Sequence, residues 1–435
     1  MTDTHAPTSV PALTDERARE LRADFPILAQ RVHDTPLVYL DFGATAQRPQ
    51  AVLDAERAFV TEHNSAVHRG SHELAALATG DYEDARETVA AFVGADADEI
   101  AWQAGATDAL NTIANGIAAA SRGRGGDASA PLRLEAGDEI LITEAEHHAN
   151  LVPWQELALA TGATLRYVPV NDHGTWALDD LRPLVSDRTR VIAFAHVSNV
   201  TGLIAPVEEI VALASTVGAV TVLDACQSVP HRPVDFHALG VDFAAFSGHK
   251  MAGPNGIGVL YGRRERLAQL PPARTGGSMI EVVTMEATTF MAPPTRFEAG
   301  TQPVSQAVAL AAACRYLAEV GMSAIRDHEE ALGARMVAEL SAIEGVTVIG
   351  NDASVPRSGL ASFIIDGVHA HDVSQYLDAA GIAVRAGHHC AQPLHRRLGV
   401  TASTRASSYL TTTDDEIDAL IEAVSGIRAY FGANR

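Results

Sequence analysis

Thr221-Val222-Leu223-Asp224 and Ser247-Gly248-His249-Lys250 are the two runs of sequence that decide the fold of this chain. The first run is typical of a buried strand ending in a carboxylate, and Asp242–Phe246 predicts a neighbouring strand that delivers Lys250 just past its end. A lysine amine can form a Schiff base with the aldehyde of pyridoxal phosphate (PLP), and a nearby carboxylate keeps the pyridine nitrogen protonated. Ser-Gly-His-Lys alone would better fit a surface lysine. The upstream Asp224-Ala-Cys-Gln227 segment reverses that preference and favours a PLP site.

The composition is that of a large folded chain without affinity for polyanions. With 435 residues, 47% of them hydrophobic, the chain can bury a core that divides between a large and a small domain. Its formal net charge of −22 repels nucleic acid and anionic membranes, so we expect neither as a partner. A local basic patch for an anionic cofactor remains compatible with that charge.

The cysteine count predicts thiol chemistry and no disulfide framework. Cys226, Cys314 and Cys390 include no Cys-x-x-Cys pair, which favours a reducing, cytoplasmic location. Residues 1–20 are polar and acidic without the apolar core of a signal peptide, so we expect a mobile tail. The longest low-charge stretch, Ile210–Val229, divides into a helix and a strand, and we expect no membrane span.

Strand-like runs alternate with helical patterns from Val38 onward, which predicts an α/β fold with a doubly wound, mainly parallel sheet. Ligands of such sheets bind at the carboxyl ends of the strands. We expect a large domain over residues 36–302, a smaller α+β domain over 21–35 and 303–435, and an exposed, flexible loop at Ser121–Pro131. The expected strands are 38–42, 99–103, 139–143, 164–168, 191–195, 220–224, 242–246 and 257–261, then 346–349, 361–365 and 382–385. The expected helices include 81–92, 107–118, 206–217, two long ones after Gln302, and a last one from the capping box Thr413-Asp-Asp-Glu416.

A phosphate cup is predicted around Thr107. Gly105-Ala106-Thr107-Asp108 follows a strand and opens a helix, so exposed amides and the Thr107 hydroxyl can bind an anion. A short Gly-Ala-Thr turn is common and predicts nothing alone. Ser247 and His249 supply further donors, and the combination favours a phosphate.

One imidazole of Glu146-His147-His148 could stack on a flat cofactor and exchange protons with a reacting substrate. A simple pair of helix-start histidines is an equal alternative. A zinc site is disfavoured, because neighbouring side chains rarely converge on one ion and no Cys/His spacing supports it.

Arg385-Ala-Gly-His-His-Cys390 is the second decisive segment. An arginine and two histidines can stabilise a thiolate at Cys390, and the polar surroundings argue against a merely buried thiol. Arg405, in a strand-like run, could clamp a substrate carboxylate in bidentate fashion, or form a structural ion pair. Two other histidine groups stay open: His68 to His72 fits a cofactor pocket, a subunit interface or a surface loop, and His369-Ala-His371 fits a solvated loop or a partner contact.

From about Asp24 to the C-terminus, the chain resembles the PLP-dependent cysteine desulfurases of the SUF iron–sulfur system, a group within the class V aminotransferase superfamily that also includes selenocysteine lyases. FSGHK is the most specific match for the PLP lysine, and RAGHHCA for the short sulfur-accepting loop of this group. The other matching segments are YLDFGATAQRP, AVHRGSHELA, EHHANLVPWQ, AHVSNVTG, DACQSVPHRPVD, GGSMI and RFEAGT.

The resemblance implies PLP fold type I and a role for each matching residue. Lys250 would hold the cofactor and move the substrate proton, and Cys390 would take the sulfur of L-cysteine as a persulfide, leaving L-alanine. Asn199 and Arg405, with Arg385, would seat the substrate. Thr301 would reach the phosphate of a second subunit, which implies a homodimer. The remaining cofactor contacts would be Asp224 to the pyridinium, Gln227 to the ring hydroxyl, His147 stacked on the ring, and Thr107, Ser247 and His249 on the phosphate.

Other readings stay open beside a desulfurase that supplies iron–sulfur cluster assembly. A selenocysteine lyase, an aminotransferase or a kynureninase-like hydrolase would share Asp224 and Lys250, although the last two have no need of the Cys390 loop. A non-catalytic sulfur carrier would not need Lys250. In this family the sulfur passes either to a zinc-free acceptor or to a small zinc-binding, U-type acceptor. His371, in an H-x-H-D-V segment, resembles desulfurases that serve the zinc type. The alternative is that His371 merely caps or solvates the start of the helix at Asp372. No metal is expected on this chain itself.

Overall fold

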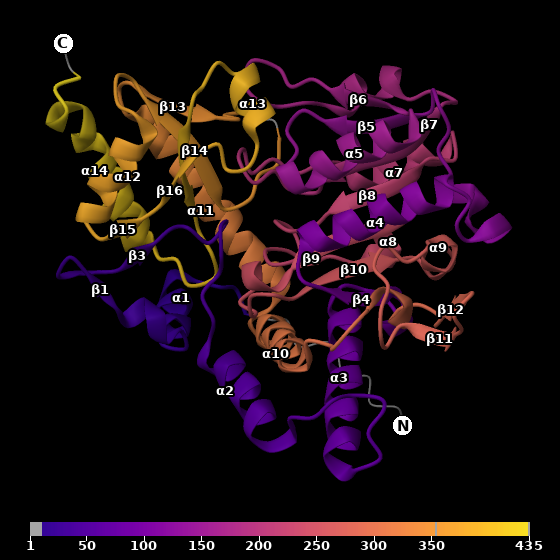
Figure 1. Cartoon of the computed structure of the whole chain (residues 1–435). Coiled ribbons are helices and arrows are strands. Elements are labelled where there is room, and N and C mark those ends of the chain that lie inside the picture. The colour runs from indigo at the N-terminus through magenta and orange to yellow at the C-terminus, as the bar shows by residue number, and fades with distance from the viewer. Residues whose placement is uncertain (1–10, 353–354, 434–435) are drawn as a thin grey trace, which may run out of the picture.

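The larger domain is built around a seven-stranded sheet (Figure 1). The structure is a computed structural model that describes residues 11–352 and 355–433. All neighbouring strands run parallel except β10, which is antiparallel to both of its neighbours. The predicted doubly wound, mainly parallel sheet is therefore confirmed. The strand order is β4 (Ile100–Gln103), β10 (Gly258–Gly262), β9 (Phe243–Ser247), β8 (Val220–Asp224), β7 (Thr189–Ala195), β5 (Glu139–Thr143) and β6 (Thr164–Val168).

Helices cover both faces of this sheet. Successive side chains of each strand point to opposite faces, so each strand contributes to the core on both sides. On β5, Ile140 and Ile142 pack with α4 (Ala106–Ser121) and α5 (Val152–Thr161), whereas Leu141 packs on the other face. That second face carries α3 (Glu73–Phe92), α7 (Val207–Ser215) and α10 (Val304–Val320). Apolar strands buried on two faces explain the nearly continuous hydrophobic runs of the sequence.

The small domain is a four-stranded antiparallel sheet with helices against it, at the left of Figure 1. Its final helix begins with the predicted capping box between Thr413 and Glu416. Among the described residues no single helix is long and apolar enough to cross a membrane; α10 and α11 (Met322–Ala342) pass that test of length and composition only as a pair, bent by 76°. The sheet order is β13 (Val346–Ile349), β14 (Leu360–Ile365), β17 (Ser403–Ser407) and β16 (Arg385–Gly387), with α12 (Ala370–Ala379), α13 (Gln392–Arg397) and α14 (Asp414–Tyr430).

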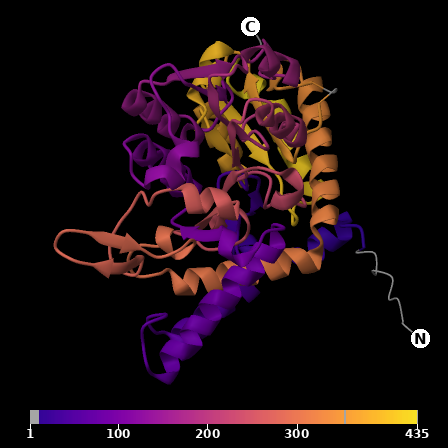
Figure 2. The same ribbon diagram turned by 90° about the vertical axis from the view of Figure 1, so that its right-hand side faces the viewer.

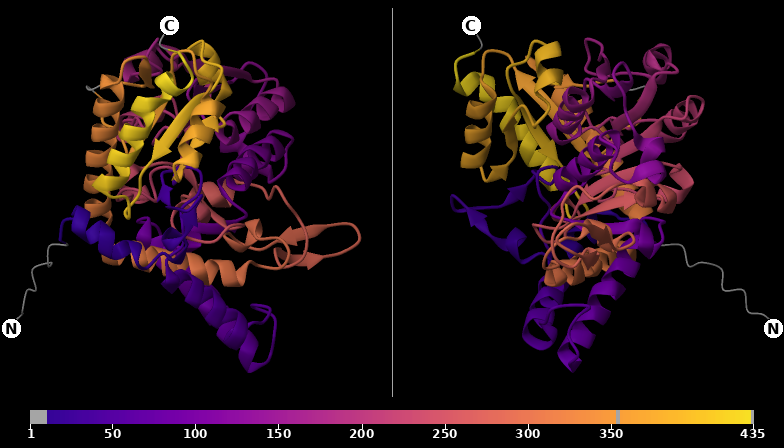
Figure 3. Two further views of the ribbon diagram at one scale, coloured as in Figure 1. Left: turned by 90° about the vertical axis from the view of Figure 1, so that its left-hand side faces the viewer. Right: turned by 45° about the vertical axis from the view of Figure 1, so that its right-hand side comes forward.

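Two segments project from the body (Figures 2 and 3). One is the hairpin of β11 (Ile280–Val283) and β12 (Thr288–Phe290), which exposes Val282, Val283 and Met285. The other is the arm that contains the start of α3 and the end of α2 (Gln50–Ala58). The remaining short elements are β1 (Arg31–Val32), β2 (Thr35–Pro36), α6 (Leu178–Leu181), α8 (Phe236–Leu239) and α9 (Arg264–Gln269), with single turns of other helix types between them.

Three local expectations are wrong. Part of the predicted tail is the helix α1 (Asp15–Arg22), whose Ala18 and Leu21 are buried; residues 1–10 lie outside the described residues. The strand expected at 38–42 is only β3 (Val38–Tyr39), and it pairs with β15 (Ile382–Ala383) of the small domain instead of joining the large sheet. The segment Ser121–Pro131 is not simply an exposed loop, because Gly126–Leu132 forms a 3-10 helix and the buried Ser129 hydroxyl donates to Gln269 O at 2.6 Å.

Candidate active site

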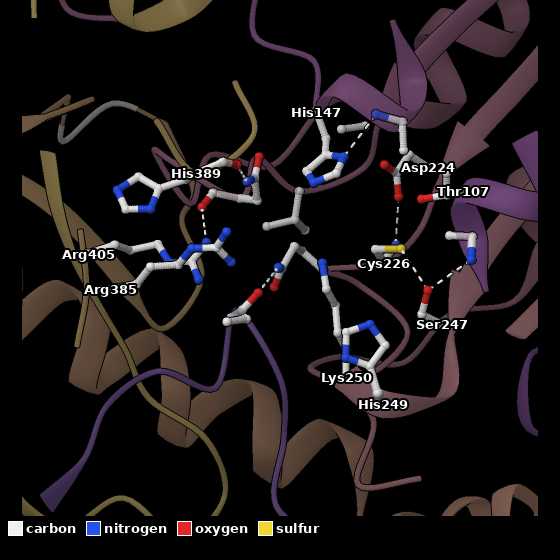
Figure 4. Close-up of a pocket in the computed structure, with 18 residues that line it drawn as sticks. Thr107, His147, Asp224, Cys226, Ser247, His249, Lys250, Arg385, His389 and Arg405 are labelled. Carbon is white, nitrogen blue, oxygen red and sulfur yellow. Dashed lines mark hydrogen bonds between the residues drawn. The ribbon is translucent and has the colours of Figure 1, made fainter. Parts of the chain in front are cut away.

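A cavity of about 170 Å³ opens at the carboxyl ends of β7, β8 and β9, between the large sheet and the small domain (Figure 4). The large sheet contributes Asp224 and Lys250, and the small domain contributes Arg385 and Arg405. The cavity thus unites residues that are far apart in the sequence, at the edge where ligands of parallel sheets bind. Its other predicted lining residues are Thr107, His147, Asn199, Gln227, Ser247 and His249.

Lys250 follows β9 directly and lines the cavity, as predicted. It is also the only lysine of the whole sequence, a signal that motif reasoning overlooked. No other side-chain amine is therefore available for Schiff-base chemistry anywhere in this chain.

Asp224 ends β8 and is 6% exposed. Its Oδ1 accepts a hydrogen bond from the Cys226 backbone N–H at 3.0 Å, and the carboxylate also lines the cavity, where it can accept from a ligand. Gln227, just beyond, donates from Nε2 to Gly43 O at 2.8 Å. The Cys226 thiol, by contrast, is buried, and burial raises its pKa to about 12, so it stays protonated and unreactive.

The N-terminus of α4 forms one end of the cavity. Ser247 accepts a hydrogen bond from the Ala106 N–H at 2.9 Å, and Thr107 lines the same corner. Burial, with Lys250 as a second cause, lowers the pKa of His249 to about 4; the neutral ring can still donate one hydrogen bond. Helix amides and these side chains together form a binding site suited to an anion.

His147 is the imidazole that faces the cavity, whereas His148 does not line it. The Nδ1 atom of His147 accepts a hydrogen bond from the Ala149 N–H at 3.0 Å, so the neutral ring carries its proton on Nε2. Burial lowers the pKa of His147 to about 4. His147 is thus both the N-cap of the turn His148–Asn150 and the imidazole that could meet a cofactor, and its stacking on a cofactor stays a prediction.

Beneath His147 lies a buried carboxyl group that the sequence did not single out. Glu146 is 2% exposed and accepts hydrogen bonds from Thr143 Oγ1 at 2.6 Å, Asn150 Nδ2 at 2.7 Å and the Ala195 N–H at 3.2 Å. Burial raises its pKa to about 7. Glu146 thus links the ends of β5 and β7 next to His147.

The segment His388–Ala391, here called the sulfur loop, lies beside the cavity. Cys390 is half-buried with its Sγ 3.9 Å from Arg385 Nη2, whereas Cys314, like Cys226, is fully buried. The loop backbone is left-handed at two consecutive non-glycine residues, His389 (φ 50°) and Cys390 (φ 58°). Asn199 holds the loop by donating from Nδ2 to His389 O at 2.5 Å. The cysteine beside a cation is the one predicted to be reactive.

Arg405 forms the structural ion pair that the sequence offered as one alternative, and its place at the cavity leaves the carboxylate clamp as a prediction. Its side chain is 1% exposed, lies 3.4 Å from Asp41 Oδ1 as an ion pair, and also lines the cavity. Nη1 donates to Asn199 O at 2.9 Å, and desolvation lowers the Arg405 pKa to about 10. Gly43 lies close to this side chain, since a Cβ at that position would lie 3.1 Å from Arg405 Cζ and would push the guanidinium aside by a few tenths of an ångström. The YLDFG segment that supplies Asp41 and Gly43 was matched by motif but given no role.

Several predicted residues lie outside the cavity. Thr301 is exposed and does not line it. His371 is exposed on α12, with its ring stacked on that of His369 at 5.3 Å between centroids. His72 caps α3, and His68 bonds Glu83. Within residues 11–352 and 355–433, the one group of three potential metal ligands is Asp96, Glu99 and His237, away from the cavity.

A model of the family described as Aminotransferase class-V matches residues 38–420. The chain belongs to this family. It is 54% identical to "Probable cysteine desulfurase 2" of Mycobacterium leprae over 97% of this chain and 99% of that protein. Its structure resembles an apo cysteine desulfurase of Thermococcus onnurineus with a TM-score of 0.86, at 34% identity, covering 97% and 99% of the two chains. It also resembles the protein C-DES, solved with glycine covalently linked to its PLP cofactor, with a TM-score of 0.76, at 25% identity, covering 93% and 98%.

The fold is therefore that of the PLP-dependent enzymes of fold type I, as predicted. The family membership also explains the mixed architecture, in which an antiparallel small domain closes over the carboxyl edge of a parallel sheet.

Proposed function

We propose that this chain is a PLP-dependent cysteine desulfurase that converts L-cysteine to L-alanine, takes the sulfur on Cys390 as a persulfide, and supplies iron–sulfur cluster assembly. The family and the names of its relatives support the desulfurase activity. The observation that carries the proposal is the position of the sulfur loop, which Asn199 holds beside the cavity that contains Lys250.

The residues of the cavity fit PLP. The sole lysine, the Asp224 carboxylate and an anion site at the α4 N-terminus lie around one space. These are the three groups that the aldehyde, the pyridine nitrogen and the phosphate require. His147 would cover the ring face and Gln227 its hydroxyl. When bound, the cofactor supplies an electron sink that makes the Cα proton of an amino acid removable.

The residues of this chain then divide the work. Arg405 and Asn199 bind the substrate carboxylate, which fixes the Cα–H bond toward Lys250. The Lys250 amine takes that proton and holds it. The Cys390 thiolate, stabilised by Arg385, attacks the substrate sulfur; the S–S bond forms as the substrate C–S bond breaks. The former thiol and Cα protons are returned to carbon, so L-alanine and a Cys390 persulfide are the only products and no oxidant is consumed.

An assay of the holoenzyme with L-cysteine separates this function from the other classes. We expect L-alanine together with sulfide or protein persulfide, and, with a reductant present, turnover. An aminotransferase would give a keto acid instead of alanine, and a sulfur carrier would give no alanine. The same assay with L-selenocysteine tests the selenocysteine lyase alternative, which predicts selenide release with L-cysteine reacting poorly.

The working unit that we propose is a homodimer in the cytoplasm. Thr301 is exposed, outside its own cavity, and follows the projecting hairpin, which presents apolar Val282, Val283 and Met285. Burial of these side chains against a second copy would bring a Thr301 hydroxyl to the partner's phosphate site. Light scattering should show a dimer, and Thr301→Ala should release PLP faster on dialysis than Thr295→Ala, a control nearby on the same segment. A fully active monomer would refute this assembly.

We further propose that the sulfur acceptor is the small zinc-binding U-type protein of the SUF system. His371 does not cap α12, because the N-cap is His369, whose Nδ1 accepts from the His371 N–H at 3.2 Å. The other part of the alternative, a His371 that is simply solvated at the start of the helix, agrees with its exposure and is decided by the test below. The exposed His371 imidazole is therefore available to bind zinc in place of one of the acceptor's thiolates, which frees that thiolate to attack the persulfide.

His371→Ala tests this partner. We expect the acceptor-free reaction with L-cysteine to stay nearly intact, while stimulation by the zinc acceptor is lost. His173→Ala, another exposed imidazole, serves as the control. Equal stimulation of the His371→Ala variant and the parent would refute the zinc-acceptor proposal and leave the desulfurase activity standing.

A further inference from the structure

His148 makes two hydrogen bonds that the function described above does not use. Its backbone N–H donates to Cys390 O at 2.7 Å, and its imidazole Nε2 accepts from the Gln392 N–H at 3.1 Å. His148 of the large domain therefore binds the small domain at two points, the Cys390 carbonyl and the Gln392 N–H. Because Nε2 accepts a proton here, the neutral ring carries its own proton on Nδ1.

The loop needs such a restraint. His389 and Cys390 are both left-handed, a conformation that non-glycine residues keep only where the surroundings impose it. Asn199 holds the loop at His389 O, and His148 holds it at Cys390 O and at Gln392. In this loop conformation the Cys390 Sγ lies 3.9 Å from Arg385 Nη2.

A surface groove of about 780 Å³ adjoins the hydrogen bond between His148 and Gln392. His148 and Gln392 line it together with Leu151, Tyr167 and Arg396. The two residues of the hydrogen bond thus also line an open space next to the end of the sulfur loop. A sulfur carried on Cys390 can be passed on only where an acceptor reaches the loop, and this groove is open space beside it.

We propose that His148 is a positioning residue that clamps the sulfur loop with Cys390 turned toward the substrate, and that opening of the Nε2–Gln392 bond frees the loop toward the groove. The proposal rests on the assigned role of Cys390 as the sulfur acceptor. It concerns a side chain that lines neither the PLP cavity nor the substrate site, so its effect is separable from cofactor binding.

Hydrogen exchange of the holoenzyme without substrate tests the clamp directly. In His148→Ala the peptide containing residues 388–397 should exchange about tenfold faster than in the parent, the factor expected for one lost hydrogen bond. His148→Gln should restore protection, since its amide oxygen can accept from the Gln392 N–H. His173→Ala, which removes an exposed imidazole outside the loop, should exchange like the parent.

Persulfide formation provides the second readout. His148→Ala should form the Cys390 persulfide about tenfold more slowly with an unchanged cofactor absorbance, and His148→Gln should recover most of the rate. Unchanged exchange in His148→Ala, failure of the glutamine to rescue, or a cofactor absorbance altered as in His147→Ala would each overturn the clamp. A parent that forms no persulfide on Cys390 would instead refute the proposed function, while the exchange result still judges the clamp.

Discussion

Replacement of Arg405 by lysine should weaken the binding of L-cysteine through its carboxylate alone. The guanidinium has five N–H donors, of which one binds Asn199 O and one faces Asp41 Oδ1 at 3.4 Å. Its Nε–H is buried without a hydrogen-bond partner in the ligand-free chain. Three donors therefore remain, enough for a bidentate contact with a carboxylate.

The size of the effect follows from that geometry. Lysine keeps a positive charge beside Asp41, but it cannot present two parallel N–H groups to one carboxylate. Loss of one hydrogen bond to a charged group costs about 1.5–3 kcal/mol. The dissociation constant of L-cysteine should therefore rise by roughly 10- to 150-fold, whereas the rate of the bound complex should change less.

Titration of the cofactor absorbance with L-cysteine and with cysteamine, which lacks the carboxylate, is the decisive comparison. The parent should bind cysteamine weakly, and Arg405→Lys should bind cysteamine with the same affinity as the parent. Asp41→Asn serves as the matched control, because it removes the ion pair and leaves the arginine donors in place. If Arg405→Lys lost affinity equally for both ligands, Arg405 would be only structural, and its assignment to the substrate carboxylate would be wrong.

Two further outcomes follow from the site. Borohydride reduction of the holoenzyme should add one pyridoxyl group, located on Lys250 by mass spectrometry, and Lys250→Ala should gain none; a label of equal yield in the variant would contradict the Schiff-base role. Burial raises the pKa of Glu146 from 4.5 to about 7, so the folded chain binds its proton more tightly than the unfolded chain. Unfolding free energy should therefore fall by up to about 3 kcal/mol as pH rises from 4.5 to 7, and Glu146→Gln should flatten that part of the pH profile in denaturant titrations; an identical slope would contradict it.

The sequence predicted the catalytic edge of the large sheet because polar residues there directly follow apolar strands. Asp224 ends β8 and Lys250 follows β9, and parallel strands bring those ends together regardless of the loops between them. The same logic placed Thr107 at a helix start after β4. These positions depend on local patterns, which a single sequence carries.

Contacts between distant segments could not be predicted in this way. Three contacts join the two domains between residues 190 to 364 positions apart in the sequence. They are the ion pair of Asp41 with Arg405 and the bonds of Asn199 and His148 to the sulfur loop. A two-residue strand such as β3 has no pattern that tells which sheet it joins. Helix α1 was missed because its many charged side chains concealed the two apolar side chains that it buries.

Peptide mass spectrometry of the holoenzyme after brief reaction with L-cysteine tests the central claim most directly. The account predicts one added sulfur on Cys390 and none on the buried Cys226 and Cys314, with L-alanine formed in equal amount in the first turnover. Cys390→Ser should bind PLP and L-cysteine normally and form no protein persulfide. Persulfide on Cys226 or Cys314, or an undiminished yield in Cys390→Ser, would contradict the assignment of Cys390 as the residue that takes the sulfur.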